Sequence, residues 1–213
     1  MKDKKLKGII DKDPKSFLII WGEWFFKVRS YTPIPIYSIM IFCFWWEWEN
    51  DILLWILGLL FVISGECIRL WALRYIGKFS RTRKSKVRIL VTDGPYAFMR
   101  NPLYCGNLFI LLGTTILSEL VWLVPIVTIL FFLQYHCIVL WEEATLLEHF
   151  CGDARSYFEF VPRWFPKRQM KKIDPQTYTL PRYFWRDVLK REKPTLQGIL
   201  VMLVVMILKE LSY

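Results

Sequence analysis

Residues 103–141 read LYCGNLFILLGTTILSELVWLVPIVTILFFLQYHCIVLW, two long apolar runs separated by the three residues 118–120. A helix of about 20 mostly apolar residues crosses the ~30 Å hydrocarbon core of a bilayer. The two runs, 103–117 and 121–141, therefore predict a hairpin of membrane-spanning helices. Because backbone polar groups inside a bilayer must be satisfied within the protein, the hairpin indicates an all-α integral membrane fold.

Further apolar stretches on both sides of the hairpin bring the predicted number of spans to about five. Residues 33–46 form a short span, residues 52–76 a long one, and residues 196–208 a weaker fifth one. Residues 17–26 are apolar but too short to cross a bilayer, so we expect an interfacial helix there.

Composition narrows the class of protein. The 213-residue chain is 54% apolar and 23% charged, with a net charge of +10 and a mean hydropathy of +0.29. A chain with this many apolar residues is not disordered. Its apolar and charged residues occur in separate stretches of the sequence, which argues against an ordinary soluble domain. The basic runs flank the spans, so we expect anionic lipids as partners and not nucleic acid.

Lys and Arg are concentrated in alternate loops. Of the 29 Lys and Arg residues, 27 lie in four segments: 1–30, 74–100, 155–172 and 182–193. The loops 47–51 and 118–120 contain acidic residues and neither Lys nor Arg. Since basic loops remain on the cytosolic side, five crossings predict a cytosolic amino terminus and an external carboxyl terminus.

Cysteine and histidine give no sign of a metal site. The five cysteines are scattered without a Cys-x-x-Cys pair, which predicts neither a disulfide framework nor a zinc site. The two histidines, His136 and His149, are too few for a histidine metal site, and they argue against a Ser–His–Asp catalytic triad. We expect no bound metal.

Several polar residues interrupt the spans. Glu66 and Arg69 are three residues apart, so they share a helix face and can pair. Asn107 and Gln134 lie in the two arms of the hairpin. Because polar groups in a bilayer are costly without partners, we expect helix–helix hydrogen bonds at these positions.

The loop before the hairpin, 87–106, reads VRILVTDGPYAFMRNPLYCG and is the most informative polar stretch. Asp93-Gly94-Pro95 predicts a turn, and Pro102 suits the first turn of a helix. The free amides at that helix start are a natural site for a carboxylate or phosphate. Side chains that could bind a flat or anionic group lie close by: Tyr96, Arg100 and Tyr104.

A second polar block, Glu142-Glu143, follows the fourth span. Glu142 shares a helix face with Leu146, so we expect it to turn inward while Glu143 points elsewhere. An inward carboxylate could bind an amine or a ribose hydroxyl of a cofactor. The alternative is a solvated acidic stretch.

Taken together, the two blocks resemble the integral-membrane methyltransferases that include isoprenylcysteine carboxyl methyltransferase and the phospholipid N-methyltransferases. The resemblance covers about residues 50–166 and rests on motifs in the family's order: Leu90-Val91, Gly94-Pro95-Tyr96, Arg100-Asn101-Pro102, Tyr104, Gly106, Glu142-Glu143, Phe150, Tyr157 and Val161-Pro162-Arg163. We accordingly divide the chain into a basic segment (1–30), a transmembrane core (31–166) and a basic segment with an additional span (167–213).

The resemblance implies a helical membrane enzyme that holds S-adenosyl-L-methionine in a cytosolic pocket, with the acceptor entering from the bilayer. Carried over by position, the residues that would contact the cofactor are Arg81, Arg88, Ile89, Leu90, Val91, Tyr96, Asn101, Pro102, Leu103, Tyr104 and Glu142.

Three positions depart from the family pattern. Asn101 replaces the usual histidine, so it can hydrogen-bond the cofactor but cannot act as a base. Ile138 stands where the prenylcysteine enzymes have an arginine that holds the acceptor carboxylate. Cys151-Gly152 shifts a Phe-Gly motif by one residue, which would alter the local turn.

The departures and the basic face favour methylation of an anionic lipid head, best a phosphate. The chain is similar in architecture to the bacterial member of the family that methylates the lipid A 1-phosphate, and this resemblance implies that acceptor and a bacterial inner membrane. Arg100 would counter the acceptor charge, and Glu143 would be the base for an amine acceptor. The residues expected to bind the substrate head are Arg74, Lys78 and Arg163, with Arg81 a further candidate.

Other functions remain open at this point. The acceptor could be an isoprenylcysteine carboxylate or the amine of phosphatidylethanolamine. NADPH-dependent membrane sterol reductases resemble the same hairpin, although Asn107 follows Gly106 here where they have Glu. A scaffold without catalytic activity is a third class.

Overall fold

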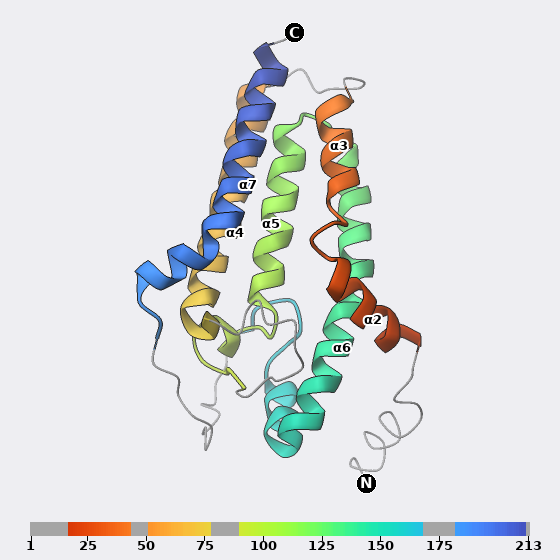
Figure 1. Ribbon diagram of the computed structural model, residues 1–213, viewed down its shortest axis with the longest axis vertical. Coiled ribbons are helices and arrows are strands. Elements are labelled where there is room, and N and C mark those ends of the chain that lie inside the picture. Colours follow the sequence, from red (N-terminus) through yellow and green to blue (C-terminus); the bar gives the residue numbers. More distant parts are fainter. Residues whose placement is uncertain (1–16, 44–50, 78–89, 168–181, 212–213) are drawn as a thin grey trace.

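The computed structural model describes residues 17–43, 51–77, 90–167 and 182–211, and these form a bundle of helices without strands (Figure 1). The elements are α2 (Phe17–Val28), α3 (Ile34–Phe42), α4 (Asp51–Ile76), the short 3-10 helix η2 (Gly94–Ala97), α5 (Pro102–Leu117), α6 (Leu123–Phe160) and α7 (Trp185–Leu211). The predicted all-α membrane fold is confirmed.

Within the described residues, three helices are long and apolar enough to cross a membrane: Ile52–Ile76, Leu123–Phe160 and Trp185–Leu211. The apolar helix α5 has 16 residues and α3 has nine. Part of the predicted first span, 44–46, lies outside the described residues, and the total of five crossings stays a prediction.

The predicted hairpin is formed by α5 and α6, which a short turn joins. Its second arm is longer than expected, because α6 continues 19 residues past Trp141 to Phe160. Apolar side chains at helical spacing in this extension pack on Leu90 and Val161, which explains why it stays helical. The backbone leaves helical geometry at Cys151 (φ 36°), where the sequence pattern shifts by one residue.

Helices α4 and α5 pack antiparallel through two pairs of glycines. A Cβ atom on Gly65 would lie 2.7 Å from the carbonyl oxygen of Gly106, and one on Gly113 would lie 2.7 Å from that of Gly58. Such close backbone approach is typical of membrane helices, where packing rather than water drives association. This contact fixes α4 against the hairpin.

The two flanking helices complete the bundle. α2 runs obliquely to the long axis and packs on α6, and its exposed Phe17 and Trp24 suit the predicted interfacial position (Figure 1). α7 begins 11 residues before the predicted fifth span at residue 196. It bends near its start (Figure 1), and Pro194, which cannot donate a backbone hydrogen bond, lies within it.

Candidate active site

The loop before α5 is tied to the segment after α6 by hydrogen bonds. The amide of Arg100 donates to the carbonyl of Pro162 at 2.9 Å, and the side-chain amide of Asn101 donates to the carbonyl of Arg163 at 3.0 Å. The hydroxyl of Tyr157 donates to the carbonyl of Tyr96 at 2.7 Å. The start of one hairpin arm and the extended end of the other therefore form one polar site.

Tyr104 on α5 and Glu142 on α6 meet at this site. The Tyr104 hydroxyl donates to Oε1 of Glu142 at 2.9 Å, and both side chains line the same cavity. The tyrosine ring also packs against Tyr135, with ring centroids 4.7 Å apart. A carboxylate and two aromatic rings thus share one wall, which suits a ligand with a flat ring and donor groups.

Glu143 does not point away from the site, contrary to the prediction. It is buried and pairs with Arg100 at 3.2 Å and with Arg163 at 2.6 Å. Burial lowers the pKa of the Arg100 guanidinium, an effect that Glu143 opposes, while the hydrogen bond to Glu143 raises the pKa of Arg163. Two consecutive residues of α6, Glu142 and Glu143, therefore both line the cavity, and two cations hold the second carboxylate.

The cavity has a volume of about 1350 Å³ and is bordered by each of the described helices α2 to α7. One end holds the polar residues described above, together with Arg29 from the end of α2. The rest runs between the spanning helices and is walled by apolar side chains such as Ile36, Leu111 and Met202. A polar head and an apolar tail could therefore occupy it together.

The structure brings most of the predicted site residues to this cavity. Its lining includes Leu90, Val91, Tyr96, Arg100, Asn101, Pro102, Leu103, Tyr104, Glu142 and Glu143. Arg163 reaches the site through Glu143, whereas the Arg74 guanidinium packs 4.6 Å from the ring of Trp185 and does not line the cavity. Lys78, Arg81, Arg88 and Ile89 lie outside the described residues.

Two buried atoms of the site lack a partner among the described residues. They are the hydroxyl of Tyr96 and Nε of Arg100. Burial raises the pKa of the Tyr96 hydroxyl well above its usual range, so this group stays a neutral donor and acceptor. Buried polar groups are nearly always hydrogen-bonded, so these atoms are available to a bound molecule.

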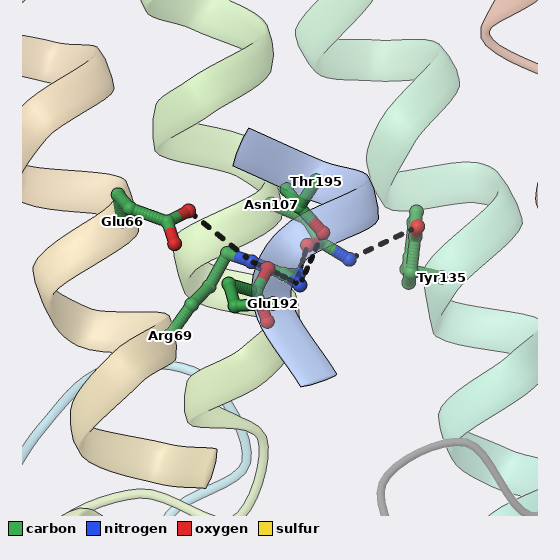
Figure 2. Close-up of polar contacts among 6 residues, drawn as sticks. All are labelled: Glu66, Arg69, Asn107, Tyr135, Glu192 and Thr195. Carbon is green, nitrogen blue, oxygen red and sulfur yellow. Dashed lines mark hydrogen bonds and ion pairs between the residues drawn. The ribbon is translucent and has the colours of Figure 1, made fainter. Parts of the chain in front are cut away.

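A second polar cluster lies deeper among the helices (Figure 2). We call it the Arg69 cluster, and its members are Glu66, Arg69, Asn107, Tyr135, Glu192 and Thr195. Nε of Arg69 donates to Glu192 at 3.0 Å, and the guanidinium also contacts Asn107 and Thr195. Glu66 lies 3.8 Å from Nε. The cluster thus joins α4, α5, α6 and α7.

The predicted pairing is confirmed for Glu66, Arg69 and Asn107, whereas Gln134 bonds a residue of the turn between α2 and α3 and not another helix. Glu66 pairs with Arg69, Asn107 donates to the Tyr135 hydroxyl at 3.4 Å, and Gln134 donates to the Thr32 hydroxyl at 2.9 Å. The sequence did not reveal Glu192, because it lies in a basic segment far from Arg69 in the chain.

The sequence is similar to a family of methyltransferases and to several known proteins. Residues 53–153 match the sequence model of the phospholipid methyltransferase family. The chain is 32% identical over 120 residues to the cobalt-zinc-cadmium resistance protein CzcN of Cupriavidus metallidurans, covering 56% of this chain and 52% of that protein. It is 31% identical over 110 residues to the nickel-cobalt-cadmium resistance protein NccN of Alcaligenes xylosoxydans (52% and 48%).

Human protein-S-isoprenylcysteine O-methyltransferase is 31% identical over 144 residues, covering 62% of this chain and 48% of that enzyme. The chain thus spans about half the length of the curated relatives it matches. No solved structure gives a significant match. The protein is a helical membrane protein whose central part is similar to membrane methyltransferases.

Proposed function

We propose that the protein is an S-adenosylmethionine-dependent methyltransferase that methylates a lipid head group, with an anionic phosphate such as the lipid A 1-phosphate as acceptor. One observation carries the proposal. A single cavity connects the Tyr104–Glu142 pair and the ion pairs of Glu143 to the apolar space between the helices. A phosphate head at the polar end would keep its hydrocarbon tails among apolar side chains.

The polar end fits the methyl donor. Glu142 can accept from a ribose hydroxyl or the amino group, and the free hydroxyl of Tyr96 can donate or accept. Leu90 and Val91 supply apolar contact for a flat ring. When bound, S-adenosylmethionine supplies an electrophilic methyl group on a sulfonium.

The charges near Glu143 favour an anionic acceptor. Arg100 and Arg163 share one carboxylate, so the three groups carry a net charge of +1. The planar guanidinium matches the geometry of a phosphate better than an ammonium does. A phosphate is already a nucleophile at neutral pH, so the protein's task is to hold the reacting oxygen in line and exclude water.

Other methyl acceptors receive less support. An amine would need a base, and Glu143 is held by two guanidiniums and is a poor candidate. Ile138, at the position where an arginine would hold a prenylcysteine carboxylate, is fully buried in the apolar core. Methylation of phosphatidylethanolamine and of isoprenylcysteine are therefore alternatives for the test to exclude, as is an NADPH-dependent reductase.

The test is methyl transfer by the purified protein. Detergent-solubilised protein is incubated with S-adenosylmethionine carrying a labelled methyl group and with lipid fractions that contain lipid A, phosphatidylethanolamine or a prenylcysteine. We expect label on the phosphate of lipid A and little on the other two. Label confined to phosphatidylethanolamine would reject the phosphate acceptor, and saturable binding of NADPH without binding of S-adenosylmethionine would reject methyl transfer.

We place the polar end of the cavity on the cytosolic side of a bacterial inner membrane. The described basic residues in the loops beside this end, including Arg100, Arg163 and Lys167, support that orientation through the positive-inside rule. The same residues would attract anionic lipids.

A further inference from the structure

The apolar part of the cavity is long enough to take a lipid tail. Its lining extends along α7 from Pro194 to Val205, and the lining of the whole cavity, polar end included, extends along α5 from Pro102 to Thr114. At 1.5 Å per helical residue these stretches are about 16 Å and about 18 Å long. Half of a bilayer's hydrocarbon core, the depth of one leaflet's tails, is about 15 Å.

One wall of this space is supplied by α7, which lies beyond the family-matched residues 53–153. Gly198, Met202 and Val205 of α7 follow one another at helical spacing and line the cavity. The wall that faces the tail is therefore a part of this chain that the family's core does not include.

Gly198 is the position where this wall is open. A Cβ atom built there meets nothing within 4 Å. Gly106 in α5 is different, because a Cβ atom there would lie 2.4 Å from Cγ of Arg69. Close packing of helices explains why position 106 is a glycine. It does not explain the glycine at position 198, which is exposed and borders the cavity.

The Arg69 cluster holds this wall in place (Figure 2). Glu192 and Thr195 contact Arg69 from the two sides of Pro194, and Gly198 follows Thr195 by about one helical turn. The cluster therefore anchors α7 about one helical turn from Gly198, at the bend of the helix.

We propose that Gly198 determines which hydrocarbon chains the cavity accepts. The absence of a side chain leaves a path along α7 for a full-length lipid tail, and a larger residue would close that path while leaving the polar end intact. This inference rests on the proposed function, in that the tail belongs to the lipid whose head is methylated.

The experiment compares Gly198→Ala, Gly198→Leu and Gly198→Phe with Val204→Phe, a matched control on the exposed side of α7 that does not line the cavity. The probes are phosphatidic acids with dihexanoyl or dipalmitoyl chains in mixed micelles. Methyl transfer gives kcat/KM for each probe, and the thermal shift that each probe causes measures binding independently of activity. Gly198→Ala provides a variant with minimal change if Gly198→Phe does not fold.

We expect Gly198→Phe to lower the ratio of kcat/KM for the long-chain over the short-chain lipid about tenfold, with Leu intermediate, Ala small and Val204→Phe unchanged. A wild-type ratio in the Leu and Phe variants would overturn the inference. If the wild-type protein methylates neither lipid, phosphatidic acid is rejected as an acceptor, and the lipid A assay described above decides on the proposed function. The thermal shifts then decide on Gly198, since equal shifts by both lipids in wild type and variants would reject it.

Discussion

Removal of the Glu192 carboxylate tests whether the Arg69 cluster anchors α7. Glu192 is fully buried, and Arg69 has a side chain that is 11% exposed, so the pair is shielded from water. Breaking a buried ion pair by removing one partner costs about 3–5 kcal/mol. Glu66 lies 3.8 Å from Nε of Arg69 and would still balance the charge, so we expect the lower value, about 3 kcal/mol, for Glu192→Ala.

For a chain of this size, 1 kcal/mol shifts the melting temperature by about 2–4 °C, so Glu192→Ala should lower it by about 6–12 °C. Glu192→Gln keeps an acceptor oxygen for the guanidinium and should cost about 1 kcal/mol. Asp187→Ala, which removes an exposed carboxylate from the first turn of α7, is the matched control and should leave the melting temperature unchanged.

The assay is size-exclusion chromatography of the detergent-purified variants after heating to a series of temperatures. A melting temperature of Glu192→Ala equal to that of Asp187→Ala would refute the reasoning, because α7 would then not depend on the buried pair.

Two further predictions concern packing and the acceptor. Gly65→Ala should lower the free energy of unfolding by about 1–3 kcal/mol, because its Cβ would lie 2.7 Å from the carbonyl oxygen of Gly106. The control is Gly152→Ala, whose Cβ would meet nothing within 4 Å and should leave stability unchanged. Thermal melts measure both variants, and equal melting temperatures would contradict the prediction. Arg163→Met should reduce kcat/KM for the phosphate acceptor about tenfold or more, because one of the two guanidiniums beside the acceptor is lost. Lys167→Met, which removes an exposed cation nearby, is its control in the methyl-transfer assay, and equal rates for the two variants would exclude Arg163 from acceptor binding.

Hydropathy alone predicted the spanning helices well. The span predicted at 52–76 is α4 at Asp51–Ile76, and the first hairpin arm differs from α5 by one residue. Burial in hydrocarbon requires unbroken apolar runs, so such helices carry a strong signal in the sequence. The extension of α6 and the early start of α7 carry charged residues, so a count of apolar residues ends these helices too soon.

The family motifs predicted which residues share the cavity but not the pairing of their charges. Tyr104 and Glu142 were expected in one pocket, and they are hydrogen-bonded in it. The orientation of Glu143 was predicted wrongly, because its partners Arg100 and Arg163 come from two other segments. Helical periodicity predicts which residues share a face of a helix, but it does not predict how many neighbouring positions line a cavity.

Contacts between distant parts of the chain explain the remaining differences. Arg69 and Glu192 are separated by 123 positions, and Glu192 lies in a segment whose net charge is basic. Arg29 belongs to the amino-terminal basic segment and was interpreted as a topology signal, yet it lines the cavity. Charged residues near a membrane serve topology, lipid contact or a site, and the sequence does not separate these uses without the fold.

Titration calorimetry of the purified protein with S-adenosylmethionine tests the central claim most directly. We predict saturable binding to the wild-type protein, at least tenfold weaker binding to Glu142→Ala, and unchanged binding to Glu148→Ala, which removes an exposed carboxylate from the same helix. Absence of binding to the folded wild-type protein, or equal affinity in Glu142→Ala, would contradict a donor site between Tyr104 and Glu142.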